Sequence, residues 1–263
     1  MQENKKFKIV SSKKTRYLLP NILTLAGVCL GISSIKFSID GNFTLAVTLI
    51  LLAAILDALD GRIARLIKGT SEFGKELDSL TDFVSFGIAP VFILYFWELN
   101  NYGKLGWAIT LIYSVCCVLR LARFNLTKIS ENENWKNNFF EGIPSPAGGL
   151  LILTPLILEL TEINLNYNIK SLTPYFTILI AFLLVSKVPT LSLKKISISS
   201  KSTIFILLAI GTIFILLLYY TFETLLAFSV TYLISIPISY FIFKIENKKN
   251  IIELNDEEHE DVL

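Results

Sequence analysis

The sequence predicts an all-α, polytopic bundle of membrane-spanning helices. Of its 263 residues, 53% are hydrophobic and only 17% are charged, whereas about a quarter of the residues in a typical soluble domain are charged. The apolar residues form long runs, and the charges gather at the two tails and between the runs. A net charge of +2 gives no reason to expect nucleic acid as a partner. Membrane lipid is the solvent that this composition fits.

Eight apolar runs are candidates for spans, because a membrane helix needs about 20 mostly apolar residues. They cover residues 20–36, 42–59, 80–97, 105–121, 147–160, 172–185, 203–220 and 223–243. The fifth and sixth runs are short. Prolines inside several runs can kink a membrane helix without preventing it. Gly27 and Gly31 lie four residues apart in the first run, a spacing typical of close helix packing, although such a pair also arises by chance.

The positions of Lys and Arg predict the orientation of these helices. Connections that stay in the cytoplasm are enriched in Lys and Arg. With eight spans, all but three of the 24 such residues lie on the side that holds both tails, the exceptions being Lys36, Lys104 and Lys170. We therefore expect both termini to face the cytoplasm.

Composition divides the chain into four parts. We expect a basic cytoplasmic tail or surface helix, a helical core, two additional C-terminal membrane helices and a charged cytoplasmic tail. These parts cover residues 1–17, 18–195, 196–245 and 246–263, respectively. The first part mixes Lys and Arg with apolar residues, so it fits either a disordered tail or a helix that lies on anionic lipid.

Four aspartates flank one predicted turn. Residues 57–82 read DALDGRIARLIKGTSEFGKELDSLTD, with one pair at Asp57 and Asp60 and a second at Asp78 and Asp82. Spacings of three and four residues place each pair on one face of a helix, and GTSEFG is a turn signal. We expect an antiparallel hairpin in which both pairs meet at its cytoplasmic end. The alternative, caps and interfacial charges paired with neighbouring Lys and Arg, accounts for only one or two of the aspartates.

Carboxylates gathered beside lipid require a cation, because each is costly to desolvate and they repel one another. Mg²⁺ and Mn²⁺ prefer carboxylate oxygens and often bridge substrate phosphates. Such ions stabilise the entering and departing oxygens of a displacement at phosphorus. Gly61 would let a ligand or a helix approach closely, and Gly74 would serve the turn. Arg65 can hold a phosphate through two hydrogen bonds.

This stretch resembles the signature of the CDP-alcohol phosphotransferase family, D-x2-D-G-x2-A-R-x8-G-x3-D-x3-D. Every fixed position is matched, by Asp57, Asp60, Gly61, Ala64, Arg65, Gly74, Asp78 and Asp82. The resemblance assigns residues 18–195 to the family core, and it implies that the hairpin binds a CDP-linked lipid and Mg²⁺ or Mn²⁺. It further implies that the first three aspartates are metal ligands, and that Asp82 is the base and also touches metal. Family members commonly have six core helices and form homodimers, so eight helices would mean two additional ones.

Segments outside the signature favour serine as the acceptor alcohol. Residues 19–34, 79–90, 119–125, 139–148 and 185–194 are similar to the bacterial, membrane-embedded branch of the family that uses serine. That branch transfers the phosphatidyl group of CDP-diacylglycerol to L-serine. The similarity implies an enzyme of the bacterial cytoplasmic membrane whose active site faces the cytoplasm. Arg120, Arg123 and Asn125 are candidates to hold the serine or a phosphate, and both arginines also fit ordinary positive-inside anchors.

Two alternatives remain at this point. Within the family, the acceptor could be glycerol 3-phosphate or an inositol phosphate, for which we identify no separate cationic cluster. In a different class, the chain could be a cation transporter, since carboxylates inside a membrane also mark ion pathways. A transporter predicts acidic residues deep in several spans, whereas here the four aspartates lie in one hairpin.

Overall fold

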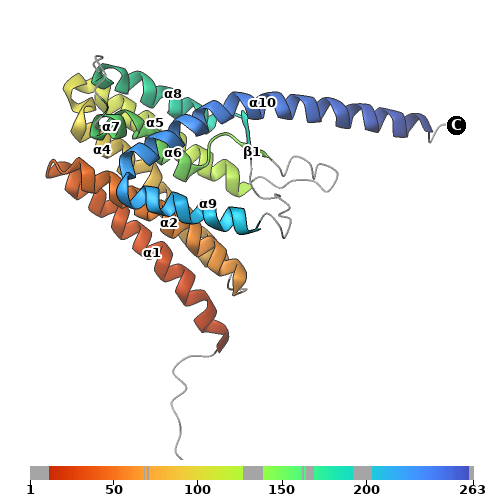
Figure 1. Cartoon of the computed structure of the whole chain (residues 1–263), viewed down its shortest axis with the longest axis horizontal. Coiled ribbons are helices and arrows are strands. Elements are labelled where there is room, and N and C mark those ends of the chain that lie inside the picture. The colour runs from red at the N-terminus through yellow and green to blue at the C-terminus, as the bar shows by residue number, and fades with distance from the viewer. Residues whose placement is uncertain are drawn as a thin grey trace, which may run out of the picture. The chain divides into compact units, whose positions relative to one another are not determined.

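The computed structural model describes residues 12–67, 69, 71–126, 139–161, 163, 169–191 and 203–260, and most of them are helical (Figure 1). The chain forms two compact units, Met1–Leu121 and Ala122–Leu263. Elements that begin in the first unit are α1 (Ser12–Ile39), α2 (Phe43–Leu66), α3 (Glu72–Asp82), η1 (Phe83–Ile88), α4 (Ala89–Trp97), η2 (Leu99–Tyr102) and α5 (Lys104–Leu126). Those of the second are β1 (Phe139–Glu141), α6 (Ser145–Ile152), α7 (Thr154–Leu160), η4 (Ile169–Leu172), α8 (Thr173–Val185), β2 (Pro189–Leu191), α9 (Thr203–Tyr219) and α10 (Thr221–Glu260).

Small residues let α1 pack closely against its neighbours in the first unit. A Cβ atom added to Gly31 would lie 2.8 Å from Ser85 Oγ and 3.0 Å from Ser85 Cα, and one added to Gly27 would lie 3.3 Å from Thr81 Cγ2. Ser85 Oγ also donates a hydrogen bond to the Gly27 carbonyl oxygen, at 3.1 Å. The predicted close contact at the two glycines is therefore confirmed.

A π-helical segment, η1, interrupts the third long helix directly after Asp82. α5 packs against this segment: Tyr113 Oη donates to the Phe86 carbonyl oxygen at 3.0 Å, and a Cβ added to Gly87 would lie 2.9 Å from Cys117 Sγ. π-helical turns are rare in proteins, and those that occur often lie at functional sites. The predicted run at 80–97 is thus the later part of a longer span, Glu72–Trp97.

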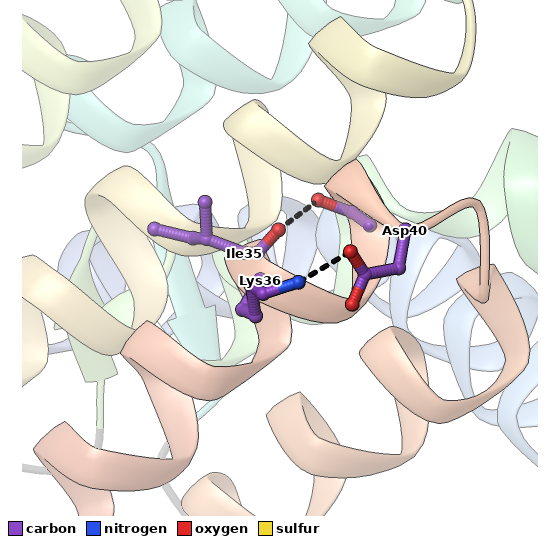
Figure 2. Close-up of polar contacts among 4 residues, drawn as sticks. Ile35, Lys36 and Asp40 are labelled. Atoms are coloured by element: carbon purple, nitrogen blue, oxygen red, sulfur yellow. Dashed lines mark hydrogen bonds and ion pairs between the residues drawn. The ribbon is translucent and has the colours of Figure 1, made fainter.

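The turn between α1 and α2 satisfies its polar groups locally. Lys36 forms an ion pair with Asp40 at the end of α1, as Figure 2 shows. Gly41 has a positive φ of 78°, which glycine adopts without steric cost. Asn42 then caps α2, its Oδ1 accepting from the Leu45 backbone N–H at 3.1 Å.

The second unit contains shorter helices and one two-stranded antiparallel ladder. β1 pairs with β2 so that Phe139 lies opposite Leu191 and Glu141 lies opposite Pro189. Gly142, directly after β1, has a φ of 75°. The all-α prediction therefore holds for the described residues apart from this ladder, whose three-residue strands are too short to give an alternating pattern in the sequence.

Five helices among the described residues are long and apolar enough to cross a membrane. They are Leu18–Ile39, Phe43–Leu66, Glu72–Trp97, Lys104–Leu126 and Thr221–Ile245. The predicted count of eight spans is not confirmed. The run at 147–160 is divided between α6 and α7, where Pro155 lies in the first turn of α7. The runs at 172–185 and 203–220 correspond to the shorter apolar helices Ile169–Val185 and Leu207–Tyr219. The orientation of the two termini stays a prediction.

Candidate active site

The hairpin of α2 and α3 forms as the turn residues predict. α2 ends at Leu66, and α3 begins after Ser71, whose Oγ accepts from the Gly74 backbone N–H at 2.9 Å. A Cβ added to Gly74 would lie 3.1 Å from Ser71 Oγ and 3.2 Å from Asn21 Oδ1 of α1. Gly74 therefore lies in the first turn of α3 and not in the connection between the helices, where it was predicted. Its lack of a side chain accommodates the cap and α1.

Three of the four aspartates converge across this hairpin. Asp57, Asp60 and Asp78 each offer a carboxylate oxygen, and these oxygens all lie within 4.8 Å of one another. In an octahedral site with oxygen ligands at about 2.0–2.1 Å, opposite ligands are about 4 Å apart. The three carboxylates therefore offer the donor type that a hard divalent cation prefers, at a spacing close to that of such a site.

Asp82 lies one helical turn after Asp78, beside the same cluster. Its Oδ1 is buried without a hydrogen-bond partner among the described residues. Its carboxyl group lies within hydrogen-bonding reach of Asp57. An unsatisfied buried acceptor costs about 1–3 kcal/mol, and a charged one costs more. Such an oxygen can accept a proton from a substrate or contact a cation that the neighbouring aspartates hold.

Arg120 of α5 places a buried positive charge next to these aspartates. Its side chain is only 7% exposed, and its charge interacts with Asp57 and Asp82. Of its two predicted roles, this burial favours a role in the site over an anchor at the membrane surface. If all four carboxyl groups are ionised, a single guanidinium leaves the cluster negative, which again suits a divalent cation.

Gly61 directly follows Asp60 in α2, and Arg65 lies about one helical turn after Gly61. Gly61 and Arg65 are exposed, Ala64 is half-buried, and Arg65 Nε donates to the Gly61 carbonyl oxygen at 3.0 Å. In the part of the chain that the structure describes, nothing lies within 4 Å of a Cβ added to Gly61. Of the two predicted reasons for a glycine here, space for a ligand fits this surface, while a packed neighbouring helix does not.

Arg123 and Asn125 belong to the second unit, in the last turns of α5. Arg123 Nη1 donates to the Val185 carbonyl oxygen at 2.6 Å, and Nη2 donates to that of Ser186 at 3.1 Å. Arg123 thus satisfies carbonyl groups at the C-terminal end of α8, which helix geometry leaves without partners. Asn125 is exposed. For both residues, binding of serine or phosphate stays a prediction.

Thr24 of α1 is a site residue that was not predicted from the sequence. Thr24 Oγ1 donates to Asp60 Oδ2 at 2.7 Å, although the two residues are 36 positions apart. The one available signal is its spacing: it lies three residues before Gly27 and seven before Gly31, and therefore on the same face of α1.

Comparison with known proteins gives the context for this geometry. The family model for CDP-alcohol phosphatidyltransferase matches residues 17–191. CDP-diacylglycerol–serine O-phosphatidyltransferase of Helicobacter pylori is 37% identical over 199 residues, which are 76% of this chain and 82% of the relative. The protein of that name from Mycobacterium leprae is 43% identical over 54% of this chain and 48% of its own length. The one from Bacillus subtilis is 33% identical over 58% of this chain and 86% of its own length.

The match covers the helices that carry the aspartates as well as most of the chain around them. With five helices able to span a bilayer, the chain is an integral membrane protein. The signature, its clustered carboxylates and the extent of the match together show that the chain belongs to the CDP-alcohol phosphatidyltransferase family.

Proposed function

We propose that this protein transfers the phosphatidyl group of CDP-diacylglycerol to the hydroxyl of L-serine, giving phosphatidylserine and CMP. The observation that carries the proposal is the cluster of carboxylate oxygens within 4.8 Å in the family signature, with Asp82 and Arg120 beside it. The choice of serine rests on relatives from Helicobacter pylori, Mycobacterium leprae and Bacillus subtilis, whose names specify that acceptor.

Asp57, Asp60 and Asp78 would hold Mg²⁺ or Mn²⁺, and Asp82 would add a further contact. The spacing of their oxygens and the all-oxygen donor set support this assignment. When bound, the metal would neutralise the diphosphate of the CDP-lipid and stabilise the charge that develops on departing CMP.

Asp82 is the proposed general base. It would accept the proton of the serine hydroxyl as the serine oxygen forms a bond to the phosphorus that carries diacylglycerol. The bond from that phosphorus to the bridging oxygen of CMP breaks, and CMP leaves with the electron pair. The buried Asp82 Oδ1, which has no hydrogen-bond partner among the residues that the structure describes, supports this role, since a general base must be free to accept the proton it takes.

The remaining signature residues would bind and orient the lipid substrate. Arg65 is exposed and can donate hydrogen bonds to a phosphate oxygen. Gly61 and Ala64 would leave room for the CDP group to approach the hairpin. Gly74 would contribute to CDP-lipid binding indirectly, by letting α3 begin close to α1. Arg120 would hold the serine carboxylate or a lipid phosphate, which its burial beside Asp57 and Asp82 supports.

The active site would face the cytoplasm of a bacterial cell, with both termini on the same side of the cytoplasmic membrane. The distribution of Lys and Arg supports this orientation. Serine and the CDP group would enter from water, and the acyl chains would stay in the bilayer. The expected homodimer rests on the family resemblance alone and stays a prediction.

A panel of alcohols tests the proposal. Purified protein in lipid nanodiscs receives CDP-diacylglycerol and Mn²⁺, together with L-serine, glycerol 3-phosphate, an inositol phosphate or no alcohol. CMP and the lipid product are both quantified. We expect CMP and phosphatidylserine in equal amounts with serine, and little CMP with the other additions. Transfer to glycerol 3-phosphate in preference to serine would contradict the assigned acceptor, and ion flux without release of CMP would contradict the assigned class.

A further inference from the structure

Thr24 joins α1 to the aspartate cluster through a single hydrogen bond. The side chain lies on the buried face of α1 and is 5% exposed. Two acceptors lie within reach of its hydroxyl group: Asp60 Oδ2 at 2.7 Å and the Pro20 carbonyl oxygen at 3.0 Å. A hydroxyl group has one proton and donates to one acceptor at a time. Because hydrogen bonds to a carboxylate are shorter and stronger than those to a neutral carbonyl, Asp60 is the favoured acceptor.

Buried threonines in other helices of this chain use the hydroxyl differently. Thr110 of α5 and Thr177 of α8 each donate to the carbonyl oxygen four residues earlier, at 3.0 and 2.9 Å. Such a bond within the helix is the ordinary way to satisfy a threonine that lies in a helix interior. Thr24 has that option through Pro20, and its shorter bond nevertheless goes to another helix.

Asp60 is the least exposed residue of the three clustered aspartates, at 4% for the whole residue. A bond to Oδ2 restricts rotation of its carboxyl group. A carboxylate has about four lone-pair sites on its two oxygens, so it can accept this bond and still contact a cation shared with Asp57 and Asp78. Groups that hold a metal ligand in this way typically change metal affinity by about 10–100-fold when they are removed.

We propose that Thr24 is a positioning residue: its hydroxyl group orients the Asp60 carboxylate for binding of a divalent cation by the cluster. This inference rests on the metal role given to Asp57, Asp60 and Asp78 in the proposed function. It adds α1 to the elements that build the site.

Replacement of Thr24 tests the inference, with Mn²⁺ binding measured by electron paramagnetic resonance on full-length protein in nanodiscs. Thr24→Val removes the hydroxyl group and keeps the shape of the side chain, and Thr24→Ser keeps the hydroxyl group. Thr110→Val is the matched control, because the buried Thr110 hydroxyl donates to the Gly106 carbonyl oxygen of its own helix. If Thr24→Val does not fold, Thr24→Ala removes the same hydroxyl group without adding bulk.

We expect Thr24→Val to raise the Kd for Mn²⁺ about 10-fold, the lower end for loss of such a group. Thr24→Ser and Thr110→Val should stay within about twofold of the wild type, since both keep the bond to Asp60. The Mn²⁺ concentration for half-maximal CMP release should rise in Thr24→Val by the same factor as the Kd. The kcat at saturating Mn²⁺ should change much less, a separation that general destabilisation would not produce.

Two results would overturn the inference, and they differ from failure of the metal role itself. Unchanged Mn²⁺ affinity in Thr24→Val, with weakened binding in Asp60→Asn, would remove Thr24 from the site and leave the metal role intact. Equal losses in Thr24→Val and Thr110→Val would assign the effect to packing. Wild-type protein that binds Mn²⁺ no better than Asp60→Asn would overturn the metal role together with the inference that rests on it.

Discussion

Charged side chains are arranged in opposite ways at the two ends of α2: opposite charges pair near its start, and like charges gather near its end. Just before its first turn, exposed Lys36 of α1 pairs with exposed Asp40 (Figure 2). Asn42 then caps the helix. At its last turns, Asp57 and Asp60 face further carboxylates across the hairpin, and a buried oxygen of Asp82 has no partner among the described residues. A turn needs only the first kind of arrangement. The second is costly beside lipid, which supports the proposed binding of a cation and a substrate at this end of the helix.

Removal of divalent metal should have the largest effect. Without a cation, the carboxylates repel one another and the substrate diphosphate, so we expect CMP release to fall to the background rate after treatment with a chelator. Addition of Mg²⁺ or Mn²⁺ should restore activity, as measured by CMP release in nanodiscs. Full activity in rigorously metal-free protein would contradict the metal role.

Asp82→Asn should have the next largest effect. The amide keeps the size of the side chain and cannot take the proton of serine, so we expect kcat to fall by about 10²–10⁴-fold, the usual contribution of a general base. Circular dichroism should show an unchanged thermal midpoint or a higher one, because the substitution removes a buried negative charge that lies beside Asp57 and Asp78. Asp40→Asn makes the same chemical change at the other end of α2 and serves as the control. Turnover of Asp82→Asn at the wild-type rate would exclude Asp82 as the base.

Much of the site follows from sequence because helix geometry is local. The three- and four-residue spacings of the aspartates place each pair on one face, and the short connection between α2 and α3 lets oxygens of Asp57, Asp60 and Asp78 converge. The bond from Thr24 to Asp60 is not local, so no spacing within one helix predicts it.

The fold follows from sequence only where apolar runs are long. The π-helical segment after Asp82 depends on packing against α5 through Tyr113, and hydropathy does not report such a contact. The three shorter runs are apolar, but their helices are shorter than a span requires. Proline lies at the start of α7, and the apolar helices that include α8 and part of α9 have 17 residues or fewer.

Gly31→Leu should have a moderate effect, on stability. A Cβ at this position would lie 2.8 Å from Ser85 Oγ and 3.0 Å from Ser85 Cα, and overpacking of a buried contact typically costs about 1–3 kcal/mol. We expect a lower thermal midpoint by circular dichroism in detergent. Gly211→Leu is the control, because nothing described lies within 4 Å of a Cβ there; equal midpoints for the two variants would contradict close packing of α1.

Asp40→Asn should have the smallest effect. Both partners of its ion pair are exposed, and such pairs contribute about 0–1 kcal/mol to stability. We expect wild-type activity and a thermal midpoint within a few degrees of the wild type, with the difference shrinking at high salt because exposed charges are screened. A large loss of CMP release in this variant would show that the two ends of α2 are not separate in function.

The most direct test of the metal site is an anomalous difference map from crystals grown with Mn²⁺ and recorded at the manganese absorption edge. We predict a peak between the carboxylates of Asp57, Asp60 and Asp78, which a crystal of Asp60→Asn should weaken or lose. A map with no manganese among these three side chains, at a Mn²⁺ concentration that supports full CMP release, would contradict the account.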